Sequence, residues 1–203
     1  MIDVSDEDGL RVVTLNRVDK ANSLTSAMLT QLVTVFQDST DARALILTGA
    51  GDKVFSAGAD LEEAHAGLAT SPLWEEVSGA LAALPCLTIA ALNGTLAGGA
   101  FGMALACDIR LAVPRAKFFY PVARLGFLPQ PSDPVRLSAL IGPARTKLIL
   151  LGAEKLTADE ALTFGLVDRI CAPDTLLSAA RALCEASLQG DATTLHKIKT
   201  MIP

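Results

Sequence analysis

The stretches VFSAGADL, residues 54–61, and AALNGTLAGG, residues 90–99, each place glycine and alanine directly after apolar, strand-forming side chains. Such small residues let a ligand approach the backbone closely where the chain turns. We therefore expect backbone N–H groups to be exposed at Ser56–Asp60 and at Leu96–Ala100. The second turn opens into a predicted helix, whose N-terminal dipole attracts negative charge. Two such turns predict a site that holds an oxyanion between two backbone donors.

Other interpretations of the same glycines remain open at this point. Glycine-rich turns are common, so both loops are also compatible with ordinary strand-to-helix connections. A dinucleotide-binding fold is a weaker alternative, because Gly94, Gly98 and Gly99 lack its glycine spacing. A P-loop is excluded, since no lysine followed by serine or threonine comes after these glycines.

Predicted strands and helices alternate along the rest of the chain. Apolar, β-branched runs predict strands at residues 10–15, 44–47, 87–92 and 109–113. Helical spacing predicts a helix capped by Thr25 or Ser26 and further helices at residues 73–84, 100–106, 136–140, 144–151, 157–164 and 174–188. This alternation is typical of an α/β protein with crossover connections.

Composition limits the class of function. A chain of 203 residues favours one domain, and 51% hydrophobic against 19% charged residues is ample for a buried core. A net charge of -5 argues against a nucleic-acid-binding protein, which usually has a basic surface. It leaves room for an anionic small molecule, because a few local cations are enough to bind a phosphate.

The sequence also predicts a soluble, cytoplasmic protein with no membrane partner. No apolar run is long enough to span a bilayer, and Asp3, Asp6 and Glu7 do not suit a signal peptide. The four cysteines are scattered among apolar residues, without the paired spacing of a metal site, so we expect buried, reduced thiols and no metal.

The two stretches together resemble the paired signature of the enoyl-CoA hydratase/isomerase (crotonase) family. The resemblance continues in order through nearly the whole chain, at residues 15–24, 105–110, 125–129, 136–142 and 158–167. It implies an α/β fold of the crotonase type, a spiral of ββα units, usually assembled as a trimer or a dimer of trimers. It also implies a core over residues 1–190 and, at 191–203, the shortened start of a C-terminal helical segment.

Carried over residue by residue, the resemblance implies a site for an acyl-CoA thioester, with coenzyme A as part of the substrate and no prosthetic group. The oxyanion donors fall on the N–H groups of Ala59 and Gly99. The implied contacts to coenzyme A are Lys20, Ala21, Ser23, Ala57, Asp60 and Leu61. Lys20 is equally compatible with a solvated loop lysine.

The sequence departs from the family at both glutamates that position water in the hydratases. Gly102 stands in place of the first and Val122 in place of the second. Neither transfers a proton, so we do not expect ordinary hydration by the two-glutamate route. Asp133 is a candidate replacement base, although an aspartate of a surface turn before Pro134 is the favoured interpretation. Tyr120 is either a weak donor to the acyl pocket or a buried aromatic with a satisfied hydroxyl.

Glu62, Glu63 and His65 are more compatible with a solvated helix face than with a lid over the site. Three functions therefore remain. The first is an enzyme acting on acyl-CoA, a lyase or isomerase of the hydratase/isomerase type or a decarboxylase- or hydrolase-like relative. The second is a non-catalytic acyl-CoA binder, and the third is a structural partner with a decayed site.

Overall fold

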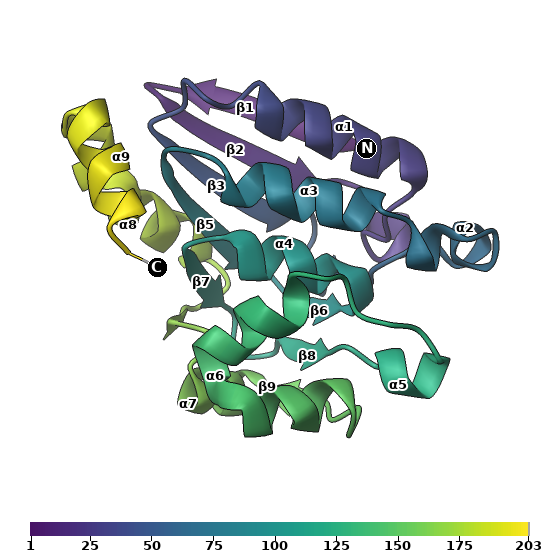
Figure 1. Ribbon diagram of the computed structural model, residues 1–203. Coiled ribbons are helices and arrows are strands. Elements are labelled where there is room, and N and C mark those ends of the chain that lie inside the picture. Colours follow the sequence, from purple (N-terminus) through teal and green to yellow (C-terminus); the bar gives the residue numbers. More distant parts are fainter. Residues whose placement is uncertain (203) are drawn as a thin grey trace.

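Two sheets form the framework of the chain, shown in Figure 1 for the computed structural model, which describes residues 1–202. The larger sheet has the order β1-β2-β3-β5-β7-β10, with bounds Ile2–Glu7, Leu10–Leu15, Ala44–Gly49, Leu87–Leu92, Ile109–Ala112 and Arg169–Ile170. Only β1 and β2 pair antiparallel there. The smaller sheet has the order β4-β6-β8-β9, with bounds Val54–Ser56, Thr95–Ala97, Lys117–Phe119 and Leu156–Thr157.

Helices cover both faces of the larger sheet. Every residue of β3 is buried, the pattern of a parallel strand without a solvent face. In Figure 1, α1 (Ser26–Gln37), α3 (Leu73–Ala82) and α4 (Phe101–Ala106) lie in a row in front of it. The helix α8 (Leu176–Gln189) contacts β3, β5 and β7.

Five further helices complete the described part of the chain. They are α2 (Leu61–His65), α5 (Val122–Leu125), α6 (Asp133–Leu150), α7 (Ala158–Phe164) and α9 (Ala192–Thr200). Of these, α7 contacts β8 and β9 of the smaller sheet. The helix α6 bends at Gly142, whose φ of 79° is non-helical, and Pro143 follows. The bend explains why two separate helices are predicted from the sequence over this range.

The structure confirms the four predicted strands and every predicted helix to within a few residues. It adds elements that the sequence pattern does not predict, among them β1, β8 and α5. The segment 54–61 begins with the three residues of strand β4, directly before the glycine-rich turn. The helix α9 falls within the predicted C-terminal segment and is tied to the core by Lys199, whose ammonium lies 2.8 Å from Asp108.

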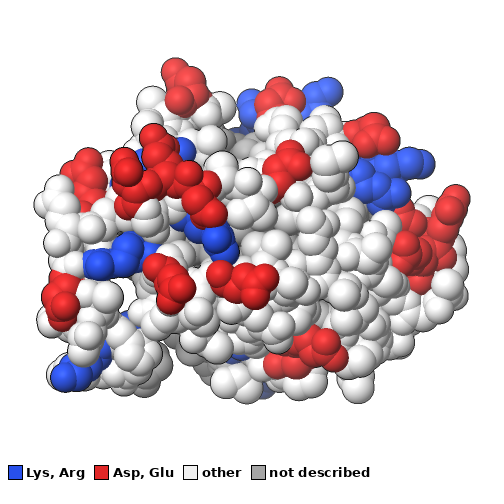
Figure 2. Space-filling view, turned by 90° about the horizontal axis from the view of Figure 1, so that it is seen from above, with Lys and Arg blue, Asp and Glu red and all other residues white. Residues whose placement is uncertain are grey.

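The distribution of surface charge and the state of the cysteines agree with the expectations from the composition. Figure 2 shows acidic and basic side chains in small separate groups, with wide uncharged areas between them, so this face carries no continuous basic surface. All four cysteines are buried and free, as predicted. Across residues 1–202, no helix is long and apolar enough to cross a membrane.

Candidate active site

The two glycine-rich loops meet because β4 and β6 are neighbouring parallel strands. Val54 pairs with Thr95, and the N–H of Thr95 donates to the carbonyl of Lys53 over 3.0 Å. Gly94 makes this approach possible, since a Cβ on it would lie 2.2 Å from the Lys53 oxygen. Further along, a Cβ on Gly58 (φ +89°) would lie 3.5 Å from the Gly99 nitrogen. The loops therefore touch at the point where both predicted donors lie.

The N–H groups of Ala59 and Gly99 donate none of the hydrogen bonds that hold these loops among the described residues. Leu24 binds the neighbours of Ala59, because its N–H donates to Gly58 and its carbonyl accepts from Asp60, both over 2.8 Å. Gly99 is the second residue of the short 3-10 turn η3 (Gly98–Ala100), where an N–H has no partner within the turn. Both donors are available to a ligand.

An apolar cavity of about 270 Å³ opens in front of both donors. Its lining comes from both loops, from α2, the 3-10 turn η2 (Leu68–Thr70), α3 and α5, and from the segments that flank α5. The residues are Ala57, Ala59, Leu61, Ala64, Ala69, Trp74, Ala97, Gly98, Gly99, Phe119, Tyr120, Pro121, Val122, Leu125, Phe127, Leu128 and Gln130. The space suits a small apolar group rather than a charged one, because nearly all of these side chains are apolar.

Trp74 forms the wall next to the second loop. A Cβ on Gly99 would lie 2.9 Å from the Trp74 ring, so glycine is what lets the indole pack against the loop. The indole N–H donates to the Leu68 carbonyl over 2.8 Å, which fixes the ring. Sequence reasoning does not identify Trp74 as a site residue, since an apolar position on a helix is usually core.

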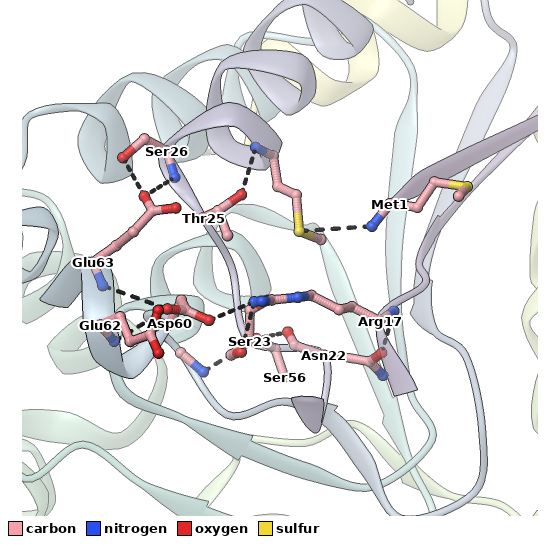
Figure 3. A network of polar contacts seen from close by, with 12 residues as sticks. Met1, Arg17, Asn22, Ser23, Thr25, Ser26, Ser56, Asp60, Glu62 and Glu63 are labelled. Carbon is pink, nitrogen blue, oxygen red and sulfur yellow. Dashed lines mark hydrogen bonds and ion pairs between the residues drawn. The ribbon is translucent and has the colours of Figure 1, made fainter. Parts of the chain in front are cut away.

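A network of polar contacts holds the first loop, as Figure 3 shows. The guanidinium of Arg17 lies 2.7 Å from Asp60 and also donates to the Ser23 hydroxyl over 3.2 Å. The Asp60 carboxylate caps α2 by accepting from the N–H groups of Glu62 and Glu63. The hydrogen bond from Arg17 holds the pKa of Asp60 below its usual range. Asp60 thus shapes the loop without lining the cavity.

The predicted coenzyme A contacts fall into two groups. Ala57 and Leu61 line the cavity. Lys20, Ala21 and Ser23 do not; they lie beside the first loop, where the Ala21 carbonyl accepts from the Ala57 N–H over 3.0 Å. Lys20 is exposed, whereas Ser23 is buried.

Asp133 is completely buried, so the favoured interpretation as a surface-turn aspartate is wrong. The hydroxyl of Tyr120 donates to Asp133 Oδ2 over 2.9 Å, and Oδ1 has no hydrogen-bond partner among the described residues. A Cβ on Gly102 would lie 3.0 Å from this Oδ1. Asp133 begins α6 and does not itself line the cavity, whereas Tyr120 does. Tyr120 is therefore buried with a satisfied hydroxyl, as one of the two interpretations predicts, and it also lines the cavity, which the other interpretation requires.

Burial controls the ionisation of this pair. It raises the pKa of Asp133 to about 7, although the Tyr120 hydroxyl and the charge of Arg136 oppose the rise. Burial also raises the pKa of Tyr120, and the carboxyl of Asp133 raises it further. Glu75, which accepts hydrogen bonds from the N–H and hydroxyl of Ser132, adds negative charge nearby. Near neutral pH, Asp133 therefore takes either protonation state while Tyr120 stays neutral.

The acidic residues after the first loop lie away from the cavity. Glu62 and His65 are exposed on α2, as predicted for a solvated face. Glu63 differs, because its carboxylate accepts from the N–H and hydroxyl of Ser26 over 2.7 and 2.6 Å. Residues 1–202 contain no group of three or more His, Cys, Asp or Glu side chains placed to hold a metal ion.

Known proteins are similar to this chain in sequence and in fold. A family model described as enoyl-CoA hydratase/isomerase matches residues 5–202. A short-chain-enoyl-CoA hydratase of Clostridium acetobutylicum is 36% identical over 185 residues, covering 87% of this chain and 71% of that protein. A carnitinyl-CoA dehydratase of Salmonella arizonae is 36% identical over 92% of this chain and 74% of its own length. The crystal structure of an enoyl-CoA hydratase from Bacillus anthracis matches with a TM-score of 0.91 and 31% identity, over 99% of this chain and 81% of that one.

Proposed function

The chain belongs to the enoyl-CoA hydratase/isomerase family, and from this premise we propose that it binds an acyl-CoA thioester at the junction of its two glycine-rich loops. The thioester carbonyl oxygen accepts hydrogen bonds from the N–H groups of Ala59 and Gly99. One observation carries the proposal. These two N–H groups have no hydrogen-bond partner among residues 1–202, they belong to residues that line an apolar cavity, and the pairing of β4 with β6 holds their loops together.

Two fixed donors favour chemistry that places negative charge on the carbonyl oxygen. In a water-poor site each donor is worth roughly 3–4 kcal/mol at the transition state, by comparison with other oxyanion holes. The turn η3 continues into α4, so helical N–H groups also point their positive end towards the second loop. The site is therefore suited to stabilising a thioester enolate.

The proposal also covers the contacts to coenzyme A, the cellular location and the oligomeric state. Ala57 and Leu61 border the thioester end of the ligand, and Lys20, Ala21 and Ser23 contact its nucleotide part. Asp60 contributes through the shape of the first loop. Coenzyme A enters as part of the substrate, with no prosthetic group, and the protein works in the cytoplasm as a trimer or a dimer of trimers.

Hydration by two glutamates is not part of the proposal. Val122 presents an apolar side chain to the cavity, and the described lining contains no carboxylate. Each missing acid or base costs on the order of 10²–10⁴-fold in rate. The same observation favours a second candidate, an acyl-CoA binder without turnover. The two differ in whether a proton moves to or from the bound acyl group.

Trp74 allows a direct test, because it is the only tryptophan of the chain and lines the cavity beside Gly99. Titration with crotonyl-CoA or butanoyl-CoA should change its fluorescence to saturation, whereas free coenzyme A should bind more weakly. In Gly99→Ala the new methyl group would meet the Trp74 ring, so either the second glycine-rich loop or the indole ring has to move. We expect an affinity loss of about tenfold or more, on the order of 1.4 kcal/mol.

Gly79→Ala is the matched control, because its Cβ meets no atom within 4 Å and it lies in α3, the helix that carries Trp74. It should bind like the wild type and be more stable by about 0.5–1 kcal/mol, as expected for alanine within a helix. Saturable binding that is unchanged in Gly99→Ala would remove the donor assignment. No binding by the wild-type protein would refute the proposed function.

A further inference from the structure

Resting on this proposed acyl-CoA site, we infer that Tyr120 is the catalytic residue that exchanges a proton with the bound acyl group, with Asp133 as the positioning residue behind it. Tyr120 is the only titratable side chain among the described residues that line the cavity. Asp133 is not part of the described lining, and its Oδ2 accepts a hydrogen bond from the Tyr120 hydroxyl over 2.9 Å.

The Tyr120 ring has little freedom to move. It stacks on Phe101 of α4 with ring centroids 5.3 Å apart and an interplanar angle of 22°. Its hydroxyl is fixed at the other end by Asp133, and only 3% of the residue is exposed. Tyr120 is thus held at its ring and at its hydroxyl while it lines the cavity, and a fixed side chain of this kind suits proton transfer, which requires heavy atoms within hydrogen-bond distance.

The unpartnered oxygen of Asp133 is explained by Gly102. The Oδ1 atom lies 3.0 Å from the position that a Cβ on residue 102 would take. A side chain there would have to share its space with the carboxyl group. Gly102 and Asp133 are therefore a matched pair, in which α6 supplies an acid to a place where α4 supplies no side chain. A buried carboxyl oxygen without a hydrogen-bond partner lowers the stability of the fold, so a role in function explains this arrangement better than a role in stability.

The charged and titratable groups around Asp133 allow it to hold or release a proton near neutral pH. Tyr120 donates to it, Arg136 lies on the same helix, and Glu75 approaches from α3. Arg136 lowers the pKa of the carboxyl while burial and Glu75 raise it, to about 7. An acid with this pKa is well suited to exchange protons at cellular pH.

The step balances without any added reactant. With Asp133 ionised, the Tyr120 oxygen takes a proton from an acidic carbon of an enoyl thioester while the former hydroxyl proton passes to Asp133. The C–H bond breaks, its electron pair enters the enolate, and the charge rests on the carbonyl oxygen between Ala59 and Gly99. Reversal at another carbon moves the double bond and restores both residues. The reaction class is a proton shift within an enoyl thioester, which needs no water.

The test is exchange of deuterium into hex-3-enoyl-CoA in D₂O, followed by mass spectrometry together with the position of the double bond. The wild-type rate should rise with pH to a plateau, with a midpoint near pH 7 set by Asp133. Tyr120→Phe should lose about 100-fold or more of the rate, with binding by Trp74 fluorescence changed less than about threefold. Asp133→Asn should lose a similar factor, and its remaining rate should show no midpoint near pH 7. Asp159→Asn, an exposed counterpart on α7, should match the wild type.

Tyrosine labelling adds a readout that does not depend on turnover. Tyr120 is the only tyrosine, so a ¹³Cζ-tyrosine label gives one signal. That signal should titrate with the midpoint of the exchange rate in the wild type and lose this transition in Asp133→Asn. It should also move when butanoyl-CoA binds.

The possible outcomes separate the two proposals. Binding without exchange in the wild type, or exchange that survives in Tyr120→Phe, overturns the inference and leaves the proposed acyl-CoA site intact. A midpoint that persists in Asp133→Asn removes Asp133 from the pair. Absence of binding by the wild type refutes the proposed function, and the inference falls with it.

Discussion

Gly94→Ala should lose at least about 3 kcal/mol of unfolding free energy, because overpacking against backbone cannot be relieved by a rotamer change. The new Cβ would lie 2.2 Å from the oxygen and 2.3 Å from the carbon of the Lys53 carbonyl. Relief requires β4 and β6 to move apart, which breaks the hydrogen bond from Thr95 to Lys53. The donors of Ala59 and Gly99 separate with them, so acyl-CoA binding should weaken as well.

Urea unfolding of Gly94→Ala beside Gly79→Ala checks this result. Both variants add one methyl group. At residue 94 it meets the backbone of Lys53, and at residue 79 it meets no atom within 4 Å. We expect opposite signs, with Gly79→Ala more stable than the wild type. A Gly94→Ala protein of wild-type stability would show that the approach of the two strands is looser than described and would weaken the account of the site.

Asp133→Asn should be more stable than the wild type at alkaline pH, by as much as about 4 kcal/mol. The folded-state pKa of about 7 lies above the ordinary 3.8. Between these values the folded wild type binds more protons than the unfolded chain, so its stability falls as pH rises, by about 1.4 kcal/mol per pH unit. Asparagine does not ionise, so its burial does not lower the stability as pH rises. The variant's advantage should therefore be small near pH 4, grow up to about pH 7 and stay constant above it.

Denaturant titrations from pH 5 to pH 9 measure this difference directly, since the other titrating groups are common to both proteins and cancel. Asp159→Asn again serves as the exposed counterpart and removes a charge without relieving burial. An advantage of Asp133→Asn that does not change with pH would mean that Asp133 is not buried as a titrating carboxyl. That result would also remove the basis for its role behind Tyr120.

The placement of the two donor loops could be predicted from the sequence. Each loop follows a strand, and small residues at 57–59 and 97–99 indicate close approach of backbone to backbone or ligand. Their meeting depends on β4 and β6, which are three residues long each and too short to show a pattern. The family resemblance, rather than periodicity, brings the two loops together.

Other features could not be read from local patterns. The strand β1 buries only Ile2, so its sequence lacks the alternation of a half-buried strand. Asp133 precedes a proline, a pattern typical of a surface turn, whereas the neighbours that surround it, Tyr120 and Gly102, come from other parts of the chain. Trp74 is a buried apolar residue of a helix, and its place at the cavity depends on its contact with Gly99, which is distant in sequence. In each case the deciding contact is distant in sequence.

The most direct test of the central claim is the infrared spectrum of bound butanoyl-CoA labelled with ¹³C at its thioester carbonyl. If the N–H groups of Ala59 and Gly99 donate to that oxygen, they polarise the bond, and its stretching band should lie at lower wavenumber than in water. The shift should be smaller in Gly99→Ala at saturating ligand and unchanged in Gly79→Ala. A bound carbonyl whose band lies at or above its position in water would contradict the account, because such a carbonyl would have no pair of backbone donors.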